Sequence, residues 1–161
     1  METITIVAWL DAPIETCFDA ARDLDLHMKS VQHTNERAVA GRTSGLIGAG
    51  EEVTWRARHF GITQHFTSRI AAFDRPRYFQ DTMQRGAFKS FVHDHSFESD
   101  RGKTKMTEAL RFSAPLGLLG RVAEKLVLRR YLKRLLELRV AAIRDAVEAA
   151  GVGHASGSTV R

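Results

Sequence analysis

Residues 90–113 read SFVHDHSFESDRGKTKMTEALRFS, and this stretch indicates a hairpin of two long β-strands. Aromatic and aliphatic side chains alternate with polar ones over 90–99 and again over 104–113, which is the pattern of strands with one buried face. Arg101 and Gly102 form the expected two-residue turn between them. That turn fixes the register and sets His95 opposite Glu108, and His93 opposite Leu110.

The same alternation predicts which side chains of these strands point inward. On the first strand the inward residues are Phe91, His93, His95 and Phe97. On the second they are Met106, Glu108, Leu110 and Phe112. A histidine and a carboxylate therefore face each other on the buried side of the hairpin.

Working outward, period-two patterning extends back to about residue 35 and is broken only at turn residues. It predicts strands at 36–42, 50–59, 62–73 and 77–85, and an alternating N-terminal strand at 3–10 brings the total to seven. The inward residues of the strand at 77–85 are Phe79, Asp81 and Met83. A turn centred on Ala87 would place Asp81 opposite His93.

Helical patterns occupy the two ends of this run of strands. Asp11 is expected to cap a helix with Pro13 in its first turn, and DLDLHMKSV at 23–31 predicts a second short helix. After Pro115 the chain is predicted to be helical to Ala150, with a break near Val127. Its main segment, 128–150, carries an apolar stripe of Leu128, Leu132, Leu135, Ala142, Ile143 and Ala146, with Arg139 in the middle.

Length and composition fit one domain over residues 1–150, followed by a Gly/Ser-rich tail at 151–161 that we expect to be disordered. No apolar stretch approaches the ~20 residues of a membrane span, and the N-terminus lacks the features of a signal peptide, so we expect a cytoplasmic protein. The one cysteine, Cys17, lies on an apolar helix stripe and is interpreted as a buried hydrophobic residue.

The net charge of +5 is concentrated in the last third of the chain. We interpret these basic residues as a solvated helix face and expect no nucleic-acid partner, because the segment lacks the exposed aromatics of a nucleic-acid platform. Peripheral contact of Arg129, Arg130, Lys133 and Arg134 with an anionic membrane or partner remains an alternative. The sequence does not indicate an oligomeric state.

A seven-stranded antiparallel sheet of this size has to close or be covered on one face, and the last helix is the available cover. The predicted class is therefore α+β. It consists of a curved seven-stranded antiparallel sheet wrapped around a long C-terminal helix, with two short helices after the first strand.

The segments IVAWLDAPIETCFDAARD, GEEVTWRARHFG, ITQHFTSRIAAFDRPRYFQDTMQRGAFKSFVHDHSFES and SAPLGLLGRVAEKLVLRRYLKRLLELR carry a resemblance. Over about residues 3–147 the sequence resembles the START-like superfamily, also called SRPBCC or helix-grip, and within it the bacterial polyketide cyclase/dehydrase-like and coenzyme Q-binding relatives. The resemblance implies the helix-grip fold and an internal hydrophobic cavity for ligands such as lipids, quinones or polyketides. It also implies that Leu46 and Ile47 lie in a loop that guards the cavity mouth.

Strand parity and the helix stripe together give a candidate ligand-binding set. It comprises Trp55, Gln64, Phe66, Phe79, Asp81, Met83, Phe91, His93, His95, Phe97, Glu108, Leu110, Leu135 and Arg139. Arg139 could pair with Glu108 or bind an anionic group of a ligand, or its tip could leave the groove for solvent.

Asp81, His93, His95 and Glu108 form a polar line in an apolar wall, and three interpretations are open. The groups could satisfy one another structurally, anchor a ligand by hydrogen bonds, or perform acid–base chemistry with His93 or His95 as the catalytic residue. A metal held by the two histidines and a carboxylate is a weaker alternative without a third histidine. We therefore predict no metal and no cofactor.

The leading prediction is a protein that binds a small hydrophobic or aromatic ligand between the sheet and the last helix. The alternative is a polyketide cyclase/dehydrase-like enzyme that uses a cavity histidine as acid or base.

Overall fold

The computed structural model describes residues 1–114 and 127–155. Within these residues, seven antiparallel strands form one curved sheet in the order β1-β7-β6-β5-β4-β3-β2. The strands are β1 (Glu2–Leu10), β2 (Arg37–Gly41), β3 (Glu52–His59), β4 (Ile62–Asp74), β5 (Tyr78–Arg85), β6 (Ser90–Asp100) and β7 (Lys103–Ser113). The helices are α1 (Ile14–Ala21), α2 (Leu24–Ser30), the short 3-10 helix η1 (Gln32–Thr34) and α4 (Arg129–Ala155).

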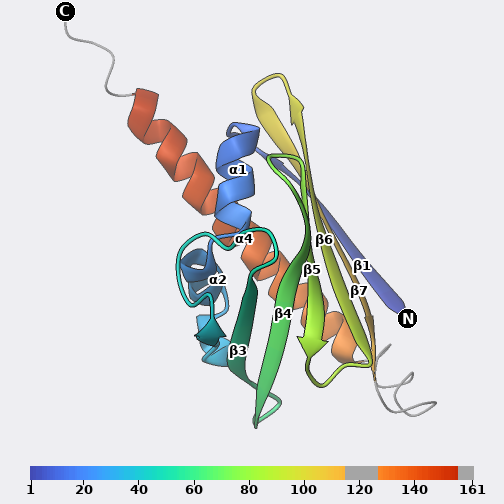
Figure 1. The fold of residues 1–161 in the computed structure, drawn as a ribbon. Helices are drawn as coiled ribbons and strands as arrows, with labels where there is room; N and C mark the ends of the chain where they lie inside the picture. The colour runs from blue at the N-terminus through green and yellow to red at the C-terminus, as the bar shows by residue number, and fades with distance from the viewer. Residues whose placement is uncertain (115–126, 156–161) are drawn as a thin grey trace, which may run out of the picture.

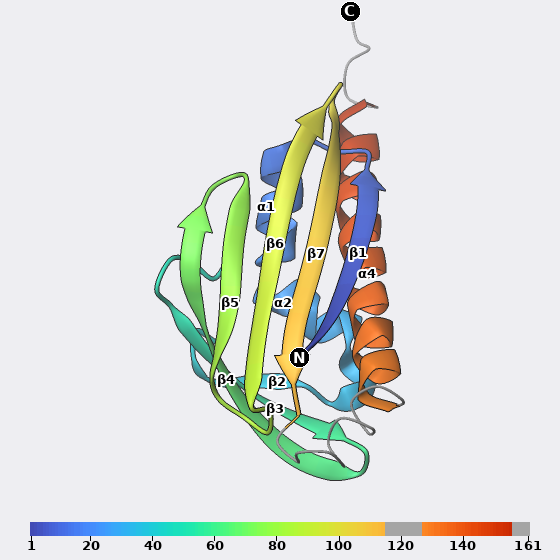
Figure 2. The same cartoon turned by 90° about the vertical axis from the view of Figure 1, so that its right-hand side faces the viewer.

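All helices lie on the concave face of the sheet (Figure 1). The long helix α4 runs along this face and packs against β1, α1 and α2 (Figure 2). It thereby covers the concave face of the sheet. This arrangement confirms the predicted helix-grip fold. No helix in the described ranges is long and apolar enough to cross a bilayer.

The predicted registers of the central hairpins are confirmed. His95 pairs with Glu108, His93 with Leu110, and Asp81 with His93. Arg101 and Gly102 have φ values of 51° and 82°. Two consecutive positive φ angles are those of a type I′ turn, whose twist matches that of the flanking strands.

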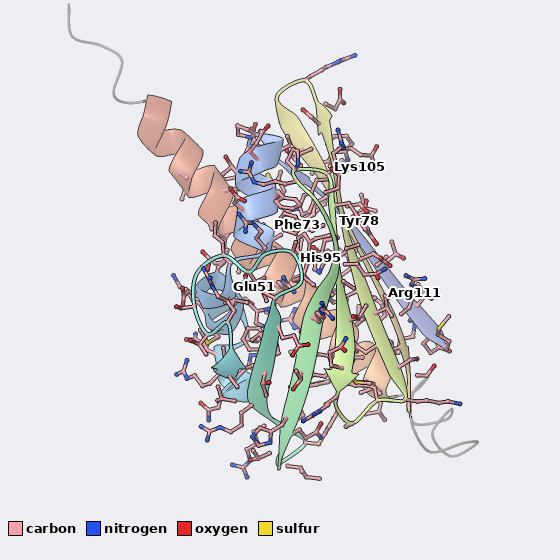
Figure 3. The ribbon with its side chains drawn as sticks, viewed as in Figure 1. Glu51, Phe73, Tyr78, His95, Lys105 and Arg111 are labelled. Atoms are coloured by element: carbon pink, nitrogen blue, oxygen red, sulfur yellow. The ribbon has the colours of Figure 1, made fainter. Side chains whose placement is uncertain are left out.

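Strand alternation separates an inner face from an outer face as predicted. On β6, His93, His95 and Phe97 are buried, and on β7, Met106, Glu108, Leu110 and Phe112 are buried. Figure 3 shows His95 on the helix side of the sheet and Arg111 on the opposite side. Burial of these apolar residues against α1 and α4 supplies the main favourable free energy of the fold.

The helix ends differ from the prediction in two places. Helix α1 begins at Ile14 with Pro13 at its N-cap and no side-chain cap, so the prediction that Asp11 caps it is wrong. Asp11 lies too early in the chain to reach the first turn, and its carboxylate is instead 3.6 Å from the Lys103 ammonium. Helix α4 continues to Ala155 rather than ending at Ala150.

The buried face of α4 is also shifted from the predicted stripe. Its buried residues are Leu132, Leu136, Val140, Ile143 and Val147. Leu132 and Ile143 belong to the predicted stripe, whereas Ala142 and Ala146 are only partly buried. Small alanines lie at the edge of the contact and the larger aliphatic side chains fill it, because the larger ones bury more apolar area. The part of the predicted helix that precedes Val127 lies outside the described residues.

Candidate functional site

A cavity of about 360 Å³ lies between the concave face of the sheet and helices α2 and α4. Nine residues of the predicted ligand-binding set line it: Trp55, Gln64, Phe66, Asp81, Phe91, His93, Leu110, Leu135 and Arg139. The other five, Phe79, Met83, His95, Phe97 and Glu108, do not line it. Phe79, His95, Phe97 and Glu108 are fully or almost fully buried in the layer behind the cavity wall.

Glu108 sits between two imidazoles. Its Oε2 atom is 2.6 Å from Nε2 of His93 and 2.8 Å from Nδ1 of His95. These contacts are short but are not aligned as linear hydrogen bonds. The side chains of His95 and Glu108 are at most 1% exposed. Water therefore cannot solvate these polar groups, and they interact with each other instead.

The protonation of this group follows from its burial. Desolvation lowers the pKa of His95 to about 3, although the neighbouring Glu108 opposes the shift. Burial alone would raise the pKa of Glu108, but its interactions with His95 and His93 outweigh burial and hold that pKa well below its usual range. His95 is therefore neutral at physiological pH, and Glu108 is ionised.

His95 is also fixed by packing. Its ring stacks on Phe79 with the centroids 4.0 Å apart and the planes 12° from parallel. Phe79 lies directly opposite His95 in the sheet, so the stack follows from the strand register. His95 thus supports the wall of the cavity, whereas His93 is the histidine of the pair that reaches the cavity itself.

Asp81 lines the cavity beside His93. Its Oδ1 atom is buried and has no hydrogen-bond partner among the described residues. Burial raises the pKa of this carboxyl, and the nearby His93 and Ser68 only partly offset the shift. A carboxyl of this kind favours its neutral form, which carries one O–H donor and a carbonyl acceptor.

A second polar group lines the cavity from the helix α2 side, and strand parity did not identify it. Nε2 of His27 on α2 lies 2.5 Å from Oε1 of Glu36. The His27 ring also packs on the indole of Trp55, with centroids 4.6 Å apart. Burial alone would raise the pKa of Glu36, but His27 holds it below its usual value.

Near the cavity opening, His59 of β3 and Tyr131 of α4 share a hydrogen bond of 2.7 Å between Nδ1 and the phenol oxygen. Both residues line the cavity. Burial lowers the pKa of His59. This bond joins the β3–β4 hairpin to the start of α4.

Arg139 enters the cavity wall as the sequence suggested, but its partner differs. Its guanidinium donates a hydrogen bond of 2.5 Å to the carbonyl oxygen of Ala21. No ion pair with Glu108 is present among the described residues. The loop prediction also fails in part, because Ile47 is buried in the hydrophobic core and neither Leu46 nor Ile47 lines the cavity.

His93, His95 and Glu108 are the group with metal-ligand chemistry in the described part of the chain, with donor atoms within 4.8 Å of one another. Both imidazoles, however, contact the same carboxylate oxygen directly. Ligand atoms of a tetrahedral zinc ion at ~2.0–2.2 Å are held ~3.3 Å apart. At 2.6 and 2.8 Å, the N···O distances are those of direct contact rather than of a shared ion.

Residues 1–148 match the family described as polyketide cyclase / dehydrase and lipid transport. The chain therefore belongs to this family, within the START-like class that its fold and internal cavity indicate. No curated protein matches the chain.

Solved structures share the fold at low sequence identity. Protein TTHA0849 of Thermus thermophilus is 18% identical with a TM-score of 0.74, over 92% of this chain and 99% of that one. A START superfamily protein of Mycobacterium smegmatis is 15% identical with a TM-score of 0.65, over 92% and 98% of the two chains. The Zhui aromatase/cyclase of Streptomyces sp. R1128 is 13% identical with a TM-score of 0.64, over 90% and 95%.

Proposed function

We propose that this protein binds one small, largely apolar molecule that carries an oxygen substituent, such as an aromatic ketone, a quinone or a polyketide-like compound, in the cytoplasm. The observation that carries the proposal is the cavity of about 360 Å³, whose apolar wall is interrupted by the carboxyl of Asp81 next to His93. Apolar pockets with a few converging polar groups are typical of small-molecule sites.

The expected role of each cavity-lining residue follows from the chemistry of its side chain. Trp55, Phe66 and Phe91 would contact the faces and edges of an aromatic guest. In its protonated form Asp81 would donate a hydrogen bond to the guest's oxygen, and Nδ1 of His93 is the ring nitrogen that does not face Glu108. A guest without an oxygen substituent would leave these groups unpaired and would bind more weakly.

Trp55 offers a direct measurement, because it lines the cavity while Trp9 is 51% exposed on the outer face of β1. In a Trp9→Phe variant, the fluorescence of Trp55 should be quenched saturably by 2-acetylnaphthalene and less strongly by 2-ethylnaphthalene at equal concentration. Ala57→Phe should abolish quenching by filling the cavity, whereas Ala71→Phe, on an exposed site of β4, should not. Linear, unsaturable quenching by both compounds would refute the proposal.

A second function, acid–base catalysis on the bound guest, is favoured by one contact. Nε2 of His93 lies 2.6 Å from Glu108, a pairing that can tune an imidazole for proton transfer. If His93 is catalytic, the protein should accelerate deuterium exchange at the methyl group of 2-acetylnaphthalene, and His93→Gln should remove the acceleration while binding survives. Exchange at the rate of buffer alone leaves binding as the function.

A further inference from the structure

An exposed apolar cluster marks the end of the molecule where the cavity opens. Phe60 and Ile62, at the β3–β4 turn, are 60% and 64% exposed, and Val127, just before α4, is 54% exposed. Phe60 also lines the cavity, so the cluster borders its opening. We call Phe60, Ile62 and Val127 the apolar tip.

The backbone at this turn holds a bulky residue in an unfavourable conformation. Phe60 has a φ of 52°, in the left-handed region that favours glycine, asparagine or aspartate. A positive φ is uncommon for an aromatic residue, and the ring of Phe60 is largely exposed. Its presence points to a role for the ring outside the folded core.

Helix α4 presents a matching face beside the turn. Val127, Arg130, Tyr131 and Arg134 follow the spacing i, i+3, i+4, i+7 and so share one side of the helix. Tyr131 anchors this side to the hairpin, because its ring lies 4.7 Å from that of Phe60. The β3–β4 turn and the start of α4 therefore form one continuous surface.

The side chains on this surface carry positive charge. In the part of the chain that the structure describes, Arg129 pairs with Glu2 and Lys133 with Glu137, while neither Arg130 nor Arg134 forms an ion pair. At the turn, Nε of Arg58 donates to the carbonyl oxygen of Gly61 at 3.2 Å. Arg58 thus lies at the turn of the apolar tip, and Arg130 and Arg134 lie on the adjacent helix face.

We propose that the apolar tip and the adjacent arginines Arg58, Arg130 and Arg134 dock the protein on an anionic lipid membrane. Exposed apolar side chains ringed by cations are the combination that binds the interface of an anionic bilayer. A membrane suits this surface better than a protein partner. The apolar residues form a projecting turn rather than a flat patch, and a guest entering beside Phe60 would pass from lipid to cavity without crossing water.

Vesicle co-sedimentation tests the proposal. The protein should bind vesicles of phosphatidylcholine containing one-third phosphatidylglycerol at low salt, bind less at physiological salt, and not bind phosphatidylcholine alone. Arg130→Gln with Arg134→Gln should lower the partition coefficient about thirtyfold, at about tenfold per 1.4 kcal/mol and about 1 kcal/mol per charge. Ile62→Ser should lower it about tenfold.

Matched controls come from the rest of the surface. Val7→Ser, at a site 52% exposed on β1, and Arg77→Gln with Arg101→Gln, at turns between other strands, should bind as the wild type does. The proposal is overturned if the wild type fails to bind at low salt, or if the control variants lose binding as much as the tip variants. Ile62, Arg130 and Arg134 do not line the cavity, so Trp55 quenching by 2-acetylnaphthalene should persist in their variants and tests the ligand proposal separately.

Discussion

Asp81 and His93 lie directly opposite each other on β5 and β6, yet His93 directs Nε2 to Glu108 on the other side. Asp81 lines the cavity, and its buried Oδ1 atom has no hydrogen-bond partner among the described residues. The strand register thus places an imidazole that contacts Glu108 next to a carboxyl that lines the cavity.

Asp81→Asn should stabilise the protein at neutral pH. Burial raises the pKa of Asp81 above its unfolded value, so the wild type loses stability as the pH rises from 3.8 through the folded pKa. The amide carries no such penalty. Urea unfolding should show a gain for the variant at pH 7.5 that shrinks toward pH 4, and an equal difference at both pH values would contradict the burial argument.

His95→Asn should reduce the acid sensitivity of the fold. Because burial lowers the pKa of His95 to about 3, the unfolded chain binds a proton that the folded chain rejects as the pH falls below 6.5. Between pH 7.5 and 5 the wild type should lose on the order of a few kcal/mol that the variant keeps. Unfolding free energies at the two pH values measure this, and His33→Asn, on an exposed histidine, is the control.

Tyr131→Phe should cost about 1 kcal/mol, the usual net value of one lost hydrogen bond. The variant removes the phenol oxygen that contacts Nδ1 of His59 and keeps the ring beside Phe60. A double-mutant cycle with His59→Ala should return a coupling energy of similar size. A coupling near zero would show that the bond does not fasten α4 to the hairpin.

The phenol of Tyr78 should lose its proton only at unusually high pH. On the outer face, its hydroxyl donates to Oδ1 of Asp94 at 2.5 Å, and desolvation together with Asp94 raises the pKa of Tyr78 to about 12. The chain has two tyrosines, so Tyr131→Phe leaves Tyr78 as the sole phenol. Absorbance titration of that variant should give a midpoint near 12, and adding Asp94→Asn should lower it.

Much of the fold could be predicted because turn length and strand alternation fix a sheet's register. A two-residue turn at Arg101 and Gly102 was enough to pair His95 with Glu108. Alternation could not tell which inward residues reach a cavity, since His93 and His95 share a face but only His93 lines it. Curvature and the distance of α4 from the sheet decide that difference.

The His27 and Glu36 pair was missed for a related reason. It joins α2 to the segment before β2, and no strand register relates these two elements. The stripe of α4 was misplaced because a helix rich in leucine and alanine offers several apolar faces, and the choice among them depends on the partner surface. Such contacts are set by packing between elements rather than by pattern within one.

The outer face of β6 offers a route to redesign. Asp94 of β6 accepts hydrogen bonds from Tyr78 and Gln80 of β5 and from Arg111 of β7. It therefore links β5, β6 and β7 on the face opposite the cavity. Side chains on the opposite, cavity-facing side of these strands can then be exchanged while the hydrogen bonds of Asp94 are kept. A scaffold built in this way should accept new cavity linings, and libraries varied at Phe66, Phe91 and Leu135 are a rational starting point for altered ligand selectivity.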